Sequence, residues 1–163
     1  MKIGRLTISD RAASGVYDDV SGPEIERVLK EFLGPDQTFV AMVVPDEQEA
    51  IAGALCRLAD EEKCELVVTT GGTGITARDV TPEATRRVLD KELPGFGEVM
   101  RMQSFQKVRT AILSRAVAGT RGTTLIINLP GKPRAVAECL GFLCEAIIEA
   151  VEHLQGRDPH QTH

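Results

Sequence analysis

Short apolar segments recur along the chain and alternate with longer segments of helical period. The short segments are rich in β-branched residues, which favour extended backbone, and each is followed by Asp, Pro or Gly. They comprise residues 2–9, 39–44, 66–70 and 123–129. We therefore predict four strands at these positions.

The longer segments predict helices between and after the strands. Apolar side chains that recur every three or four residues form one face of a helix, and that face packs on a sheet. The predicted helices span residues 22–32, 47–62 and 133–154, with broken helices in residues 93–118 and a turn at residues 119–122.

Two local signals predict where helices begin. Ser21 followed by Glu24 has the spacing of a capping box, in which each side chain satisfies a free backbone N–H of the first turn. Thr81 is expected to cap another helix, with Pro82 at its first position, where a missing N–H costs nothing.

Strands that alternate with helices are typical of a doubly wound α/β fold. We expect three layers, a mostly parallel sheet flanked by helices, in a single domain of residues 1–154, followed by a flexible tail of residues 155–163. Ligands of such folds bind at the carboxyl ends of the strands.

Composition excludes several classes of protein. The formal net charge of -5 argues against nucleic-acid binding, and one tyrosine with no tryptophan leaves no stacking platform for single strands. No apolar run approaches a membrane span, and Gly4 and Arg5 interrupt the N-terminal segment, so no signal peptide is expected. We therefore expect a cytoplasmic protein that binds neither membrane nor nucleic acid.

Cysteines and histidines add little catalytic chemistry. The four cysteines form no CxxC pair and are predicted to be core thiols. His153, His160 and His163 all lie near the C-terminus, so the body of the chain offers no histidine as general base or metal ligand.

The most informative segment joins a buried strand to a helix through a glycine turn. Gly71, Gly72 and Gly74 allow positive φ and bring backbone N–H groups close to a ligand, and Thr73 adds a hydroxyl. Asp79 follows Arg78, so the segment offers both a carboxylate for a metal and a cation for phosphate. The spacing matches neither a P-loop nor a dinucleotide fingerprint, and a plain tight turn is the alternative.

Four strand-to-helix loops are expected to converge on one crevice. They are residues 9–21, 44–47, 69–81 and 129–133. Asp46 follows one strand directly and would face Asp79 across the crevice. A helix N-cap is the alternative for Asp46, and solvation of a loop is the expected role of Asp18 and Asp19.

The order of these motifs resembles a known family, the MogA-type molybdopterin adenylyltransferases of molybdenum-cofactor biosynthesis, which are related to the gephyrin G domain. The resemblance covers residues 1–154. It is carried by Thr7-Ile8-Ser9-Asp10, Asp19-Val20-Ser21-Gly22-Pro23, Val44-Pro45-Asp46-Glu47, Thr70-Gly71-Gly72-Thr73-Gly74, Arg78-Asp79-Val80-Thr81-Pro82, Leu113-Ser114-Arg115 and Asn128-Leu129-Pro130-Gly131-Lys132-Pro133.

The resemblance implies transfer of AMP from the co-substrate ATP to the terminal phosphate of molybdopterin, with Mg²⁺ and release of pyrophosphate. It implies a homotrimer with transient contacts to other molybdenum-cofactor enzymes. It makes Asp46 and Asp79 the catalytic, metal-binding acids and Ser114 the serine of the pterin pocket. The substrate-binding residues expected with it are Ser9, Ser21, Gly71, Gly72, Thr73, Gly74, Ser114, Arg115, Pro130, Gly131 and Lys132.

This chemistry requires no protein base, because a phosphate monoester with a second pKa of about 6 is already anionic near neutral pH. Positioning and charge neutralisation supply most of the catalysis. A MoaB-like paralogue with little activity, a non-catalytic trimeric scaffold and a phosphate or nucleotide sensor are the alternative functions.

Overall fold

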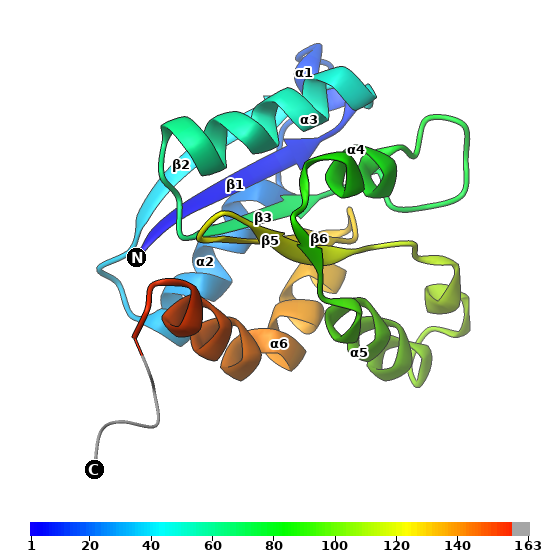
Figure 1. The fold of residues 1–163 in the computed structure, drawn as a ribbon. Helices are drawn as coiled ribbons and strands as arrows, with labels where there is room; N and C mark the ends of the chain where they lie inside the picture. The colour runs from blue at the N-terminus through cyan, green and yellow to red at the C-terminus, as the bar shows by residue number, and fades with distance from the viewer. Residues whose placement is uncertain (158–163) are drawn as a thin grey trace.

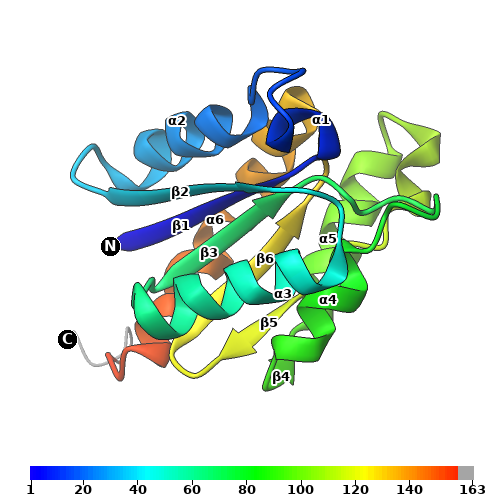
Figure 2. The ribbon, with the colours of Figure 1, turned by 90° about the horizontal axis from the view of Figure 1, so that it is seen from above.

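One six-stranded sheet forms the centre of the computed structural model, which describes residues 1–157 (Figure 1). The strands are β1 (Lys2–Ile8), β2 (Thr38–Val44), β3 (Leu66–Thr70), β4 (Lys91–Glu92), β5 (Ala118–Arg121) and β6 (Thr124–Leu129). Their order across the sheet is β2-β1-β3-β6-β5-β4, as the view from above shows (Figure 2). The first four strands in that order are parallel to one another. Strand β5 pairs with β6 in the antiparallel direction, and β4 pairs with β5 in the same way.

Helices cover both faces of this sheet (Figure 1). The helical segments are α1 (Asp10–Ala13), α2 (Ser21–Leu33), α3 (Gln48–Cys56), the π-helical turn η1 (Arg57–Glu61), α4 (Thr81–Val88), α5 (Pro94–Phe105), the 3₁₀ turn η2 (Arg109–Leu113) and α6 (Pro133–Leu154). Helices α2, α5 and α6 lie on one face, and α3 and α4 lie on the other. The predicted three-layer, mostly parallel α/β fold is confirmed.

Each face of the sheet has its own hydrophobic core. Along β3, Leu66 and Val68 pack with α2 and α6, whereas Val67 packs with α3 and α4. All five residues of this strand are buried. A strand covered on both faces has no polar side, which explains why it reads as a continuous apolar run.

The antiparallel edge of the sheet differs from our prediction. Residues 119–122 were expected to be a turn, but most of them belong to β5, and the chain reverses at Gly122, whose φ is 55°. Strand β4 was not predicted because its two residues, Lys91 and Glu92, are charged and exposed. Short charged edge strands lack the apolar pattern that marks a strand, although they protect a sheet against further pairing.

The two predicted hydroxyl caps are wrong. The Ser21 hydroxyl donates to the Gly131 carbonyl at 2.6 Å, and Asp19 instead accepts from the Gly22 N–H at 2.9 Å at the start of α2. The Thr81 hydroxyl donates to the Gly71 carbonyl at 2.9 Å rather than capping α4. Both hydroxyls therefore join loops that are distant in sequence.

The four cysteines are free thiols, and Cys64 and Cys139 are buried. Burial raises the pKa of the Cys64 thiol to about 11, so it stays protonated at neutral pH. The expectation of core thiols is confirmed for these two residues. No helix within residues 1–157 has the length and apolarity needed to cross a membrane.

The start of the predicted C-terminal tail contacts the body of the protein. Gln155 donates to the Thr123 carbonyl at 3.0 Å, and Arg157 pairs with Glu65 at 3.4 Å. Residues 158–163 of that tail lie outside the described residues.

Candidate active site

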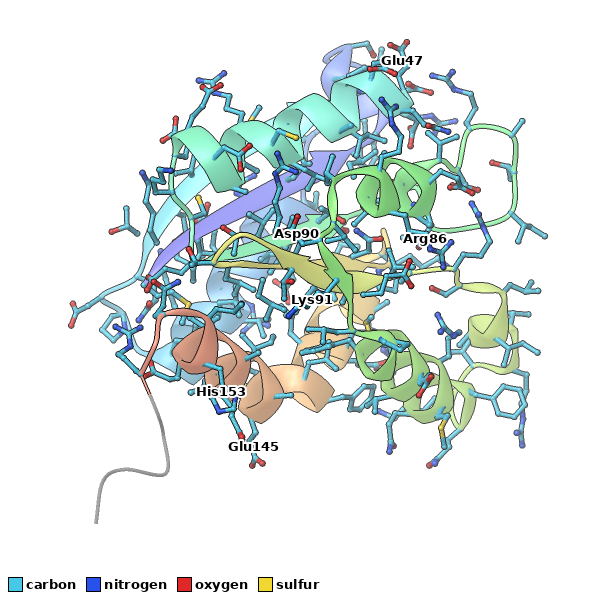
Figure 3. The ribbon with its side chains drawn as sticks, in the orientation of Figure 1. Glu47, Arg86, Asp90, Lys91, Glu145 and His153 are labelled. Atoms are coloured by element: carbon cyan, nitrogen blue, oxygen red, sulfur yellow. The ribbon has the colours of Figure 1, made fainter. Side chains whose placement is uncertain are left out.

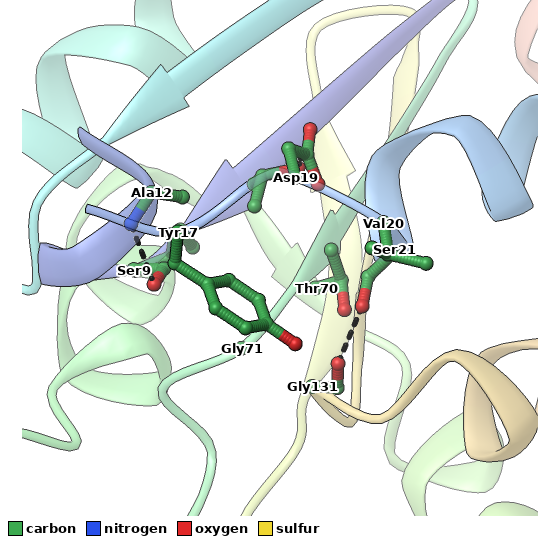
Figure 4. Close-up of a pocket in the computed structure, with 11 residues that line it drawn as sticks. Ser9, Ala12, Tyr17, Asp19, Val20, Ser21, Thr70, Gly71 and Gly131 are labelled. Atoms are coloured by element: carbon green, nitrogen blue, oxygen red, sulfur yellow. Dashed lines mark hydrogen bonds between the residues drawn. The ribbon is translucent and has the colours of Figure 1, made fainter. Parts of the chain in front are cut away.

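A pocket lies where the order of the strands reverses direction. The chain passes from β1 to β2 on one side and then to β3 on the other side of β1. Such a switch point leaves a crevice beyond the carboxyl ends of the strands. The pocket there has a volume of about 160 Å³ and includes Ser9, Ser21, Gly71 and Gly131 from three of the four predicted loops (Figure 4). The expected convergence of these loops is confirmed.

Hydrogen bonds fasten the loops to one another around this pocket. The Ser21 hydroxyl reaches the Gly131 carbonyl, as Figure 4 shows. The Thr70 hydroxyl donates to the Pro130 carbonyl at 2.7 Å, and the Gly71 N–H donates to the Leu129 carbonyl at 3.2 Å. The loops after β1, β3 and β6 are therefore held as one unit.

The glycine loop requires glycine at its first two positions. Gly71 has a φ of 98° and Gly72 a φ of 69°, which side chains disfavour. A Cβ atom on Gly71 would also collide with the Ile8 carbonyl oxygen, and one on Gly72 with the Thr81 hydroxyl. The loop thus packs its bare backbone tightly against β1 and α4.

The fourth loop joins the site through Asp46. Its carboxylate accepts from the Asp10 N–H at 2.9 Å, while the Asp46 N–H donates to the Asp10 carboxylate at 3.0 Å. Arg78 donates two hydrogen bonds to Asp10, at 2.8 and 3.0 Å. Asp46 makes no capping bond to α3, so the N-cap alternative is wrong.

Burial raises the pKa of the Asp46 carboxyl above its ordinary value, and the charges of Asp10 and Asp79 act in the same direction. The neighbouring Arg78 guanidinium instead lowers the pKa of Asp10. An added cation would therefore stabilise the charged form of Asp46.

Asp79 lies against the end of the glycine loop. One of its carboxylate oxygens accepts from the Thr76 N–H at 2.9 Å and from the Thr76 hydroxyl at 2.7 Å. A Cβ atom on Gly74 would lie 2.8 Å from that oxygen, and one on Gly72 would lie 3.1 Å from an Asp46 oxygen. The Asp46 carboxylate therefore lies beside Gly72 and the Asp79 carboxylate beside Gly74, two residues that have no side chain.

The donor set fits Mg²⁺ in chemistry. Within residues 1–157, no group of three or more acidic, histidine or cysteine side chains is arranged to hold a metal. Mg²⁺ is commonly held by only one or two carboxylates, with water and substrate phosphates completing its shell. Two carboxylates, those of Asp46 and Asp79, would suffice for such a site, and no side chain stands at Gly72 or Gly74 beside them.

Ser114 and Arg115 lie apart from the pocket of Figure 4. They line a second hollow of about 350 Å³, together with Arg86 and Arg101. Arg101 donates to the Ser114 carbonyl at 3.3 Å and to the Ala116 carbonyl at 3.1 Å. Of the expected substrate-binding residues, Ser9, Ser21, Gly71 and Gly131 thus line the first hollow, Ser114 and Arg115 line the second, and the others line neither.

Arg115 also connects the second hollow to the glycine loop. Its N–H donates to the Thr73 carbonyl at 2.9 Å, and its guanidinium donates to the carbonyls of Gly74 and Asp79, each at 2.7 Å. The same guanidinium pairs with Glu83 in the first turn of α4. Arg115 therefore acts as a clamp on the loop that carries Asp79.

Three of the remaining predicted residues, Thr73, Pro130 and Lys132, line neither hollow. Thr73 is buried, the Pro130 carbonyl accepts from Thr70, and Lys132 is exposed immediately before α6. The Lys132 side chain has no hydrogen-bond or ionic partner among the described residues.

Sequence reasoning missed several polar residues of the site. Asp19, expected to be a solvated loop residue, is 15% exposed and accepts from Arg5 and from the Thr7 hydroxyl, each at 2.9 Å. Asp10 was given no role, although an acid directly after a strand at a switch point is a usable signal. Glu83 gave no signal, because its partner lies 32 residues away.

Histidine takes no part in the site. His153 is the only histidine within residues 1–157, and it lies on α6 with Glu145, on the opposite side of the molecule from Glu47, the neighbour of Asp46 (Figure 3). The one histidine of the described residues therefore lies away from the candidate site.

Comparisons with known proteins show which proteins this chain is similar to. A family model described as a probable molybdopterin binding domain matches residues 4–150. The molybdopterin adenylyltransferase of Helicobacter pylori strain J99 is 53% identical over 154 residues, which cover 94% of this chain and 88% of that protein. The Escherichia coli K12 enzyme of the same name is 48% identical over 94% of this chain and 78% of that protein.

A solved structure of similar fold is the molybdopterin biosynthesis enzyme MoaB of Thermus thermophilus. Its TM-score is 0.88 at 42% identity, over 96% of this chain and 98% of that one. Sequence and fold thus agree. The chain therefore belongs to the family of probable molybdopterin-binding domains found in molybdenum-cofactor biosynthesis proteins.

Proposed function

We propose that this protein is a molybdopterin adenylyltransferase, which transfers AMP from ATP to the terminal phosphate of molybdopterin and releases pyrophosphate. The observation that carries this proposal is the placement of Asp46 and Asp79 beside the bare Gly72 and Gly74. The names of relatives at 48 to 53% identity support it.

Two hollows joined by one glycine loop are compatible with a reaction of two substrates. Gly71 borders the smaller hollow, and Arg115, which lines the larger one, binds the loop at Thr73 and Gly74. Each substrate would place a phosphate near the loop, where backbone N–H groups favour anions. Holding both phosphates in one geometry replaces a bimolecular encounter with an intramolecular step.

Asp46 and Asp79 are the residues that would hold Mg²⁺. When bound, that ion neutralises phosphate charge in the transition state. The chain's own part is to fix the two carboxylates: Asp10 positions Asp46, and Thr76 positions Asp79. No protein group has to remove a proton, because the attacking phosphate is already anionic.

The test is to incubate the purified protein with ATP, Mg²⁺ and molybdopterin and to measure adenylylated pterin and pyrophosphate by mass spectrometry. We expect both products in equal amounts. Pterin binding without either product would instead support a MoaB-like paralogue of low activity or a non-catalytic scaffold. ATP binding alone would support a nucleotide sensor.

We also propose a homotrimer, as the resemblance to MogA-type proteins implies. Exposed apolar side chains of α5 and η2 support this, because Met102 is 69% and Ile112 is 60% exposed. Association would remove this surface from water. Native mass spectrometry of the wild type is expected to give three times the mass of the chain. The variant Ile112→Glu is expected to have the mass of one chain. A monomeric wild type would contradict the proposal.

A further inference from the structure

Two buried polar residues interrupt the apolar face that β3 and β6 present to α4. Thr69 and Asn128 are neighbours in the register of these strands, and both are fully buried. The residues two positions before them, Val67 and Ile126, belong to the apolar core on the side of α3 and α4. Asparagine is depleted in strands, and burying an amide costs free energy unless it is hydrogen-bonded. Packing alone therefore does not account for Asn128.

The side chain of Asn128 uses all of its donors. Its amide nitrogen donates to the Thr69 hydroxyl at 3.1 Å and to the Thr85 hydroxyl at 3.0 Å. Its amide oxygen accepts from the Val117 N–H at 3.2 Å, and its backbone N–H donates to the Val117 carbonyl at 3.0 Å. The amide is thus fixed from three sides, by β3, by α4 and by the residue that precedes β5.

Further hydrogen bonds lead from Thr85 to the glycine loop. The Thr85 hydroxyl donates to the Thr81 carbonyl at 2.8 Å, and the Thr81 hydroxyl donates to the Gly71 carbonyl at 2.9 Å. Thr81 and Thr85 are also fully buried. Thr81 begins α4 and follows Asp79 by two residues. A chain of polar contacts therefore connects Val117 with Gly71 through the interior of the protein.

The two ends of this chain border the two hollows of the site. Val117 lines the larger hollow with Ser114 and Arg115, and Gly71 lines the smaller one. An apolar side chain in place of Asn128 would fill the same space without the cost of burying an amide. Hydrogen bonds are directional, however, so a fully bonded amide holds its neighbours in one arrangement.

We propose that Asn128 is a positioning residue, which acts through Thr85 and Thr81 to fix the glycine loop and the start of α4 relative to the wall of the larger hollow. The inference rests on the proposed function, whose two substrates would occupy the two hollows. Asn128 lines neither hollow, so it would act on the reaction only through other residues. Its effect would be on the placement of Asp79, and an error of about 1 Å in such geometry lowers a rate about 100-fold.

Thr85→Val is the variant that tests this role. Replacing Asn128 itself would remove a hydrogen-bond partner from Thr69, Thr85 and Val117 at once, which is expected to destabilise the fold. Valine has nearly the shape of threonine but no hydroxyl. Thr85→Val therefore breaks the connection between the amide and α4 and leaves the other hydrogen bonds of Asn128 in place.

Thr124→Val is the matched control. Thr124 lies on β6, as Asn128 does, and is 2% exposed. Its hydroxyl donates to the Cys64 carbonyl at 2.6 Å, at the opposite end of the strand from Asn128. The control therefore removes one buried hydroxyl and one hydrogen bond to a carbonyl, but outside the proposed chain of contacts.

We expect Thr85→Val to lower kcat for pyrophosphate formation about 10- to 100-fold, with little change in the KM of either substrate. Thr124→Val is expected to lose a similar amount of thermal stability and to keep its kcat. Thr85→Ser, which retains the hydroxyl, is expected to restore kcat. Wild-type kcat in Thr85→Val, or an equal decrease of kcat in Thr124→Val, would overturn the inference.

Hydrogen exchange measured by mass spectrometry tests the same role without turnover. The N–H groups of Gly71, Asp79 and Arg115 donate to backbone carbonyls, so they are expected to exchange slowly in the wild type. In Thr85→Val, peptides that contain residues 69–81 and 115–117 are expected to exchange about 10-fold faster, as loss of a buried hydrogen bond allows. Peptides of β1 and β2 are expected to keep wild-type rates. Unchanged exchange in the first two segments, or equally faster exchange throughout the chain, would overturn the inference.

The two measurements separate this inference from the proposed function. A wild type that makes no adenylylated pterin would contradict the proposed function alone, because the exchange rates would still show whether the chain of contacts fixes the glycine loop. An active enzyme whose kcat and exchange rates do not respond to Thr85→Val would contradict the positioning role alone.

Discussion

Asp79→Asn and Asp46→Asn are each expected to lower kcat at least about 1,000-fold, which corresponds to about 4 kcal/mol of transition-state stabilisation. The physical reason is that each substitution removes a negative charge from the pair that would hold Mg²⁺. The amide oxygen retains the hydrogen bonds that the carboxylates accept from Asp10 and Thr76. Steady-state formation of pyrophosphate is the measurement.

The variant Asp46→Asn is expected to lose activity without losing folding stability. Because burial raises the pKa of this carboxyl in the folded state, its ionisation costs stability as the pH rises through that pKa. Asn carries no charge, so the melting temperature of Asp46→Asn near neutral pH is expected to equal or exceed that of the wild type. Loss of activity without loss of stability is typical of a functional site.

The matched control for both acids is Asp60→Asn. Asp60 is likewise a hydrogen-bonded carboxylate, which accepts from Arg121 at 2.7 and 3.0 Å, but it lies on η1 and lines neither hollow of the site. Full activity is expected in this variant. Wild-type turnover in Asp46→Asn or Asp79→Asn would show that the acid concerned is not part of the catalytic machinery.

Arg115→Lys is expected to lower kcat about 10- to 100-fold, the usual effect of a group that positions a metal ligand. Lysine keeps the positive charge but has no planar fork, so it cannot reach the Gly74 carbonyl, the Asp79 carbonyl and Glu83 together. The loop that carries Asp79 would then lose its fixed geometry. The Mg²⁺ concentration needed for half-maximal activity is expected to rise, which distinguishes a positioning role from general destabilisation.

Arg121→Lys provides the control for this clamp. Arg121 likewise joins a carboxylate, that of Asp60, to a backbone carbonyl, that of Val88, but outside the site. Comparable loss of stability with unchanged kcat and Mg²⁺ dependence is expected there. If Arg115→Lys behaved in the same way, the clamp would be structural only. Glu83→Gln should give a smaller effect than Arg115→Lys, because the carbonyl contacts of Arg115 remain.

The strands differ in how well the sequence predicted them. Residues 66–70 were predicted as a strand with the bounds that β3 has, because burial on both faces produces an uninterrupted apolar run. Strand β5 was taken for a turn. Its four residues include two that are polar and a glycine, and its pairing with β6 depends on a hairpin rather than on its own pattern.

Within the site, too, the sequence predicted some side-chain positions and not others. The sequence predicted that Asp46 would approach the glycine loop, because both follow parallel strands at one edge of the sheet. It did not predict the reciprocal hydrogen bonds of Asp46 with Asp10, which join residues 36 positions apart. Periodicity and capping rules describe neighbours within a few residues, and such pairs lie beyond their range.

The sequence by itself determined the layered α/β fold, the glycine loop and the acids beside it, since these depend on local periodicity, on backbone freedom and on the order of strands and helices. Only the tertiary structure decided how the polar side chains are used. The Ser21 hydroxyl bonds to Gly131, 110 residues away, and Arg115 holds the Asp79 loop while lining a separate hollow. A hydroxyl or guanidinium pairs with whichever carbonyl or carboxylate the packed layers place beside it, and that choice is made by the whole fold.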